Sequence, residues 1–260
     1  MSSLLLAISC GLGLGCILGL LGGGGGLIAV PLFAAVFGWS FDQSGNASLA
    51  CVFAGSAMAV ITHARSGRLR IRESVIFGLV GTVAAIGGSL AAFAIPDVVQ
   101  HAVLTCLLIL AGSLMWKRAW QVRRGNTQGG SPSQSLNVLG VTSLSAAVGI
   151  GFIVGVLGIS GGFLTVPAFT TVVGMSVPQA SASALIVVLI NSAAALTARV
   201  SRFESGDIIA LLAGSTAIGA VIGARLARRT SAVMLASMFG SLMFAIALWE
   251  ASRTLAILSA

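Results

Sequence analysis

Two glycine-rich runs, each followed by a proline, are the residues of this chain best suited to bind a ligand. The first run is Gly22–Gly26 with Pro31, and the second is Gly158–Gly162, which includes Ser160, with Pro167. Glycine and proline both weaken an α-helix, and a broken helix exposes backbone N–H groups. The helix that resumes after a break carries partial positive charge at its N-terminus. Both runs could therefore hold an anion without a basic side chain.

Serine and asparagine residues near each run could donate further hydrogen bonds to the same ligand. We therefore predict a substrate-binding set with members in both halves of the chain, and we expect Pro31 and Pro167 to break the helices that carry the runs. The predicted binding residues are Gly22, Gly23, Gly24, Gly25, Gly26, Asn46, Ser48, Gly158, Ser160, Gly161, Gly162, Ser183, Asn191 and Ser192.

Other glycines have a different explanation. Gly11, Gly15 and Gly19 recur at a spacing of four residues, as do Gly151 and Gly155. This spacing is typical of close packing between membrane helices. We expect these five glycines to serve packing.

Residues that would support catalysis or metal binding are scattered. Ser160 lies in a G-x-S-x-G pattern, but a nucleophilic serine needs a base, and no histidine follows it. His63 and His101 lie near the ends of apolar segments, where we expect them at the membrane interface. The cysteines form no C-x-x-C pair, and a role for Cys16 or Cys51 stays open. We expect no enzymatic activity, no cofactor and no metal site.

The composition indicates a membrane protein. Of its 260 residues, 57% are hydrophobic and 8% are charged, and the mean hydropathy is +1.07. Soluble domains carry about 25% charged residues. The net charge of +8 comes from basic residues in short loops between apolar segments, which is the positive-inside pattern and not that of a nucleic-acid-binding protein. It predicts that loops 64–72 and 117–135 are cytoplasmic.

Apolar segments near the ~20 residues that span a bilayer recur along the chain. We predict an all-α, polytopic membrane protein with about eight transmembrane helices. The predicted segments are 3–37, 44–62, 74–95, 98–116, 137–174, 180–198, 207–224 and 231–250.

The chain is a duplication. When 15–33 is placed over 151–169, an offset of 136, ten of the nineteen positions are identical. We predict two homologous four-helix repeats, each opening with a Gly-rich broken or re-entrant helix. The parts of this single transmembrane domain, 1–260, are repeat 1–116, a polar basic linker 117–136, and repeat 137–260. Interrupted segments in corresponding places point to a transporter whose binding site lies between the two halves.

The relative orientation of the repeats stays open. Four crossings per repeat would make them parallel, whereas a partial second crossing within each long segment, 3–37 and 137–174, would make them inverted. The parallel arrangement puts Arg225, Arg228 and Arg229 outside, and the inverted arrangement puts Arg199, Arg202 and Arg253 outside. Each leaves three of the fourteen basic residues on the unfavourable side.

The stretches "LLGGGGGLIAVPLF" and "VLGISGGFLTVPAF" resemble the sulfite exporter TauE/SafE family, also called the toluene sulfonate uptake permeases. A later element of the Gly-Thr-Ser-Leu type departs from the family pattern, since Asn46–Leu49 and Ala182–Leu185 each keep one hydroxyl, on Ser48 and Ser183. The resemblance covers nearly the whole chain.

The resemblance implies a multi-pass protein of the bacterial inner membrane that moves sulfite, thiosulfate, sulfonates or related anions. Three acceptor oxygens on such an anion suit many weak donors that converge. Its expected partners are a small anionic substrate and the lipid bilayer, with a coupling ion, proton or sodium, and the oligomeric state left open. The alternative is a transporter of another small solute, a neutral metabolite or a metal ion.

Overall fold

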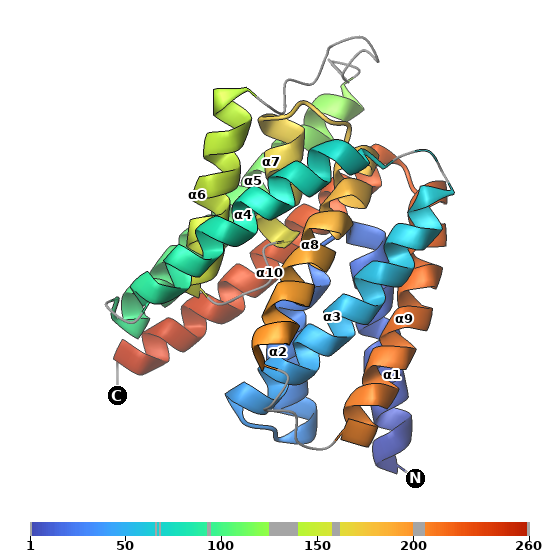
Figure 1. The fold of residues 1–260 in the computed structure, drawn as a ribbon, viewed down its shortest axis with the longest axis vertical. Helices are drawn as coiled ribbons and strands as arrows, with labels where there is room; N and C mark the ends of the chain where they lie inside the picture. Colours follow the sequence, from blue (N-terminus) through green and yellow to red (C-terminus); the bar gives the residue numbers. More distant parts are fainter. Residues whose placement is uncertain are drawn as a thin grey trace.

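The computed structural model describes residues 2–65, 67, 69–92, 95–124, 140–157, 162–199 and 206–258, and in these residues all regular structure is helical (Figure 1). The helices are α1 (Ser2–Leu21), α2 (Gly25–Phe37), α3 (Phe41–Ala64), α4 (Ile71–Ala92), α5 (Asp97–Arg123), α6 (Val141–Leu157), α7 (Gly162–Thr171), α8 (Val177–Arg199), α9 (Gly206–Arg229) and α10 (Ala232–Leu258). The prediction of an all-α fold is confirmed.

Seven of the described helices are long and apolar enough to cross a membrane, namely α1, α3, α4, α5, α8, α9 and α10. This confirms a protein with several membrane spans. The shorter helices α2, α6 and α7 arise because each long apolar segment holds two helices. The 13 residues of α2 and the 10 residues of α7 are about 20 and 15 Å long at 1.5 Å per residue, which is too short for a full crossing of ~30 Å.

The chain reverses direction between α1 and α2. Gly22 has a φ of +81°, which glycine adopts without strain, and the helix resumes at Gly25. A Cβ built on Gly25 would lie 2.9 Å from the Cβ of Leu18 and 3.3 Å from the carbonyl oxygen of Leu14. The start of α2 therefore lies back along α1.

Local signals set the next boundary. Gly38 ends α2 in the left-handed region, with φ of 66°, and its N–H donates to the carbonyl of Ala34. Ser40 then begins α3 with a capping box, in which its hydroxyl accepts from the N–H of Gln43 and the Gln43 side chain accepts from the N–H of Ser40. This pairing satisfies donors that the first turn would leave unbonded.

Close packing between helices of different halves holds the fold together. Along α1, Gly11, Gly15 and Gly19 contact α9 at successively later residues, Ser215, Thr216 and Ala224 in turn, so α1 and α9 run parallel. Likewise, Gly151 and Gly155 of α6 contact Gly81 and Ala85 of α4, again in parallel. The prediction that these five glycines serve packing is confirmed.

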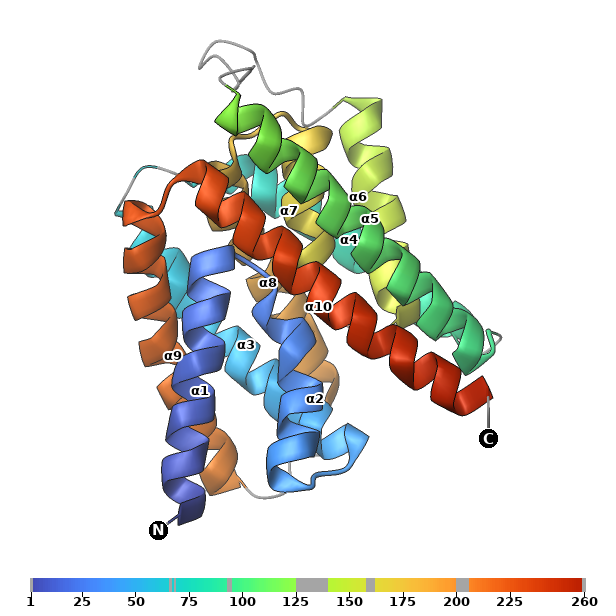
Figure 2. The ribbon, with the colours of Figure 1, turned by 180° about the vertical axis from the view of Figure 1, so that it is seen from behind.

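The pair α1 and α9 runs in the opposite direction to the pair α4 and α6. In both views α1, α3 and α9 run toward one end of the molecule, whereas α4, α6 and α8 run away from it (Figures 1 and 2). The end reached by α3, α5 and α9 lies opposite the two chain termini. Basic residues gather at the helix ends found there: Arg65, Arg70, Arg72, Lys117, Arg118, Arg123, Arg124, Arg225, Arg228 and Arg229. We call this the basic end.

Helix α7 lies in the interior of the fold. Every residue from Gly162 to Thr170 is buried, and Phe169 packs edge-to-face on Phe77 of α4, with ring centroids 4.9 Å apart. A helix that is buried on all sides contacts protein rather than lipid. It is therefore placed where backbone exposed by a neighbouring break would be shielded from the bilayer.

We expect Gly15→Val to lower the midpoint of thermal unfolding in detergent. A Cβ at Gly15 would overlap the carbonyl of Thr216 and lie 2.8 Å from the amide nitrogen of Ala220, and overpacking of this kind costs about 1–3 kcal/mol. Gly13→Val is the matched control, because a Cβ at Gly13 meets no atom within 4 Å. Equal midpoints for the two variants would contradict the packing role.

Candidate functional site

The starts of α2 and α7 meet through their backbones. A Cβ built on Gly23 would lie 2.6 Å from the carbonyl oxygen of Gly162, and one built on Gly162 would lie 2.6 Å from the Cα of Gly23. From this contact α7 runs toward the basic end and α2 runs the opposite way (Figures 1 and 2). We call Gly22–Gly26 together with Gly162 the glycine junction.

Neighbouring helices lie close to the glycine junction. The backbone of Ser181 in α8 lies where a Cβ on Gly22 would be, and the Cδ2 of Leu242 in α10 lies 3.1 Å from the Cβ position of Gly24. All five glycines of the first run are buried. The junction therefore joins elements of both halves.

The junction offers backbone N–H groups rather than charged side chains. Gly24 precedes α2 and provides no side-chain hydrogen bond to cap it. Two helix N-termini that face one region of space add their partial positive charges, each of about half an elementary charge. Such an arrangement can bind an anion chemically, because the N–H groups donate to its oxygens.

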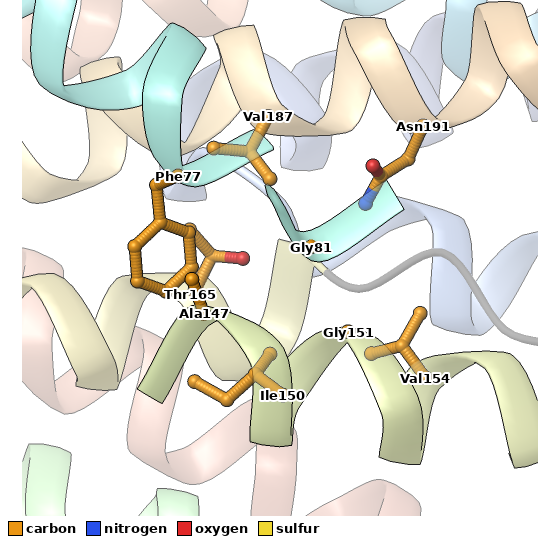
Figure 3. Close-up of a pocket in the computed structure, with 9 residues that line it drawn as sticks. All are labelled: Phe77, Gly81, Ala147, Ile150, Gly151, Val154, Thr165, Val187 and Asn191. Atoms are coloured by element: carbon orange, nitrogen blue, oxygen red, sulfur yellow. The ribbon is translucent and has the colours of Figure 1, made fainter. Parts of the chain in front are cut away.

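A cavity of about 10 Å³ lies beside α7, and this space admits the centre of about one water-sized group. Thr165, one turn beyond Gly162, and Asn191 supply its polar groups (Figure 3). The Oγ1 of Thr82 donates to the Oδ1 of Asn191 over 2.7 Å. The lining residues are Phe77, Gly81, Ala147, Ile150, Gly151, Val154, Thr165, Val187 and Asn191.

The cavity and the glycine junction are neighbours. The Cγ2 of Val188 lies 2.5 Å from the Cβ position of Gly162, and Val187, the preceding residue, lines the cavity. Asn191 is one turn further along α8. Of the predicted binding residues, Gly162 and Asn191 therefore lie in one region, together with the first glycine run.

The predicted hydroxyls of α8 bind protein groups. The Oγ of Ser183, which is fully buried, accepts from the backbone N–H of Arg70 over 3.1 Å and so ties α8 to the start of α4. The Oγ of Ser192 has two possible acceptors, the carbonyl oxygens of Val188 and Leu189, at 2.7 and 3.2 Å. Neither hydroxyl lines the cavity.

The structure does not test the other residues that we predicted to bind the substrate. Asn46 and Ser48 are buried in α3, at 6% and 5% exposure, and their part in binding stays a prediction. Gly158, Ser160 and Gly161 lie outside the described residues.

The prediction that Pro31 and Pro167 break their helices is wrong. Pro31 lies inside α2 and Pro167 lies inside α7, so the first segment breaks at its glycines. A proline inside a helix removes one backbone hydrogen bond. Both helices continue past their proline, and each has buried residues that pack against the rest of the protein. In α7 the carbonyl of Pro167 also accepts the hydroxyls of Thr170 and Thr171, each over 2.8 Å.

Three polar residues near the site were not expected there. Thr82 and Thr165 look like ordinary hydroxyls within apolar segments, and no local pattern marks them. His63 lies near the end of α3 as expected, but its ring is 2% exposed and its Nε2 is 3.4 Å from the carbonyl oxygen of Gly19, one turn before the glycine junction. Among the described residues, no three His, Cys, Asp or Glu side chains gather where they could hold a metal ion.

We expect Ser183→Ala to lower the midpoint of thermal unfolding and Ser192→Ala to leave it nearly unchanged. Loss of the Ser183 hydroxyl leaves the N–H of Arg70 without its acceptor, at a cost of about 1–3 kcal/mol. Ser192 bonds only carbonyls of its own helix, which keep their helical partners. A larger loss for Ser192→Ala than for Ser183→Ala would contradict these roles.

Comparisons with known proteins agree with a membrane transporter. Residues 7–249 match the family described as Sulfite exporter TauE/SafE. A "Probable membrane transporter protein" of Xylella fastidiosa strain Temecula1 is 32% identical over 270 residues, which cover 99% of this chain and 98% of that protein. A protein of the same name from Xylella fastidiosa strain 9a5c is 36% identical over 189 residues, 72% of this chain and 70% of the relative. No solved structure matches the chain significantly.

The family match extends over nearly all the chain, and it covers most or all of each of the seven described helices that are long and apolar enough to cross a membrane. The resemblance first noted in the two glycine-rich stretches is thereby confirmed. The protein belongs to the TauE/SafE sulfite exporter family and is a membrane transporter.

Proposed function

We propose that this transporter moves small oxyanions of the sulfite, thiosulfate or sulfonate type, and that it is not an enzyme. The observation that carries the proposal is the contact between Gly23 and Gly162, where two short helices begin and then diverge. Their N-termini form the binding group, and the anion's oxygens accept hydrogen bonds from backbone N–H groups.

The interior favours a small anion held by neutral donors. Among the described residues, no lysine or arginine side chain is buried, so a bound anion would depend on helix ends and polar side chains. Each helix end contributes about 0.3–1 kcal/mol when exposed, and up to about 2 kcal/mol where it is partly buried. Two such ends plus the amide of Asn191 give a site that binds and releases its substrate.

The two repeats, 1–116 and 137–260, are inverted with respect to each other in this proposal and are joined by the linker 117–136 in a single domain. The directions of the helices support it, because α1, α3 and α9 oppose α4, α6 and α8. The offset of 136 pairs α1 with α6, α3 with α8, and α4 with α9. Alternating access then comes from one repeat rocking against the other around the glycine junction.

The basic end faces the cytoplasm of a bacterial cell in this proposal, with loops 64–72 and 117–135 on that side of the inner membrane. Basic residues at the ends of α3, α5 and α9 and at the start of α4 support it through the positive-inside rule. This choice leaves Arg199, Arg202 and Arg253 on the other side, as the inverted arrangement requires.

Cysteine labelling distinguishes the inverted from the parallel arrangement. In a variant with its own four cysteines replaced, we expect Val141→Cys and Ser231→Cys to react with a membrane-impermeant maleimide from the same side, and Asp207→Cys from the opposite side. All three positions are exposed and lie at or beyond helix ends. Reaction of Ser231→Cys and Val141→Cys from opposite sides would overturn the inverted arrangement.

Uptake into proteoliposomes tests the function. We expect radiolabelled sulfite, thiosulfate or a small sulfonate to accumulate, with taurine as the zwitterionic control. Gly162→Val should reduce uptake at least tenfold at matched protein levels, because any side chain there meets the Cα and carbonyl of Gly23. Gly149→Val is the matched control in the same half, since a Cβ there meets no atom within 4 Å.

Two results would contradict the proposal. Transport of a neutral metabolite or a metal ion in place of every anion would show that the substrate class is wrong. Anion uptake that Gly162→Val leaves intact would show that the glycine junction is not the binding group.

A further inference from the structure

The duplication does not repeat the polar groups at and beside the cavity. With the offset of 136, the counterparts of Thr82, Thr165 and Asn191 are Ile218, Ala29 and Gly55. The counterpart positions therefore carry no hydroxyl and no side-chain amide. A Cβ on Gly55 would also lie 2.7 Å from the Cδ2 of Leu18, so apolar packing occupies the corresponding space.

The hydroxyl of Thr82 has two acceptors within reach and one proton. Its Oγ1 lies 2.8 Å from the carbonyl oxygen of Gly78 and 2.7 Å from the Oδ1 of Asn191. A hydroxyl donates one hydrogen bond at a time. Gly78 lies inside α4, so its carbonyl already accepts from the N–H four residues later, and it loses little when the Thr82 proton points to Asn191.

The direction of that proton decides which end of the Asn191 amide faces the cavity. When Thr82 donates to Oδ1, the amide nitrogen is on the cavity side, as Figure 3 shows. When Thr82 donates to Gly78, its oxygen accepts from Asn191 instead, and the amide must turn so that Oδ1 faces the cavity. The first arrangement presents two N–H donors, and the second presents an acceptor.

We infer that Thr82 is a positioning residue, which holds the Asn191 amide so that the cavity presents hydrogen-bond donors to one oxygen of the transported anion. This inference rests on the proposed oxyanion transport and adds a subsite to it. The cavity admits about one water-sized group, which matches a single oxygen of the anion. A metal cation would need oxygen ligands and meets amide hydrogens instead, so the subsite selects for anions.

The first test compares Thr82→Val with Thr82→Ser in the proteoliposome assay. Valine keeps the shape of threonine and loses the hydroxyl, whereas serine keeps the hydroxyl. We expect Thr82→Val to raise the KM for the transported anion about tenfold with little change in maximal rate, and Thr82→Ser to stay within about twofold of the unaltered protein. Thr62→Val is the matched control, because Thr62 bonds only the carbonyl of Met58, over 2.8 Å.

The second test separates positioning from a general effect on structure. If Thr82 acts through the amide, Thr82→Val should add less than twofold to the KM of Asn191→Ala, because the two effects are then not additive. Asn191→Asp keeps the size of the side chain but presents an oxygen to the cavity, so it should abolish anion uptake while the unfolding midpoint changes little.

The outcomes separate this inference from the proposed function. If the unaltered protein moves no anion, the proposed function fails first. If it moves an anion and Thr82→Val behaves like Thr62→Val, or if the effects of Thr82→Val and Asn191→Ala multiply, Thr82 does not position the amide. Uptake by Asn191→Asp at the rate of the unaltered protein would also overturn the inference. It would show that an oxygen facing the cavity does not hinder binding of the anion.

Discussion

The contact between Gly23 and Gly162 depends on the absence of a side chain at both residues. Each glycine lies where the other's Cβ would be, so any other residue at either position would force α2 and α7 apart. Membrane helices gain little from hydrophobic burial against one another, and small residues that allow close approach take its place. The same constraint applies where α1 meets α9 and where α4 meets α6. The positions of the two short helices, and hence of the candidate site, follow from these close approaches.

Much of this arrangement could be predicted from the sequence, because the duplication shows which segments of the two halves correspond. The offset of 136 relates Gly22–Gly26 to Gly158–Gly162 and indicated that two interrupted helices belong together. Glycine spacing indicated the packing faces of α1 and α6 in the same way. The prolines misled, since proline weakens an isolated helix but Pro31 and Pro167 lie in helices that tertiary contacts support. The low helix propensity of glycine and proline therefore indicated which segments are interrupted. It did not indicate the residue at which the chain turns.

The polar contacts could not be predicted, because they join residues far apart in the sequence. Thr82 and Asn191 are 109 residues apart, and Arg70 and Ser183 are 113 residues apart. A serine in an apolar segment looks the same whether it accepts a hydrogen bond from the start of another helix, as Ser183 does, or bonds its own helix, as Ser192 does. Side-chain type gives the capacity to donate and accept, whereas only the packed structure decides which partner uses it.

The pairing of α1 with α9 has a consequence for biosynthesis. Helix α1 leaves the ribosome long before α9, which begins at Gly206, yet its glycine face contacts α9. Since chains are made from the N-terminus at about 5–20 residues per second, α1 is in the bilayer for about 10–40 seconds before its partner exists. During that interval the glycine face of α1 cannot make its contacts with α9. Native assembly of the first half is therefore late, and it is coupled to completion of the second half.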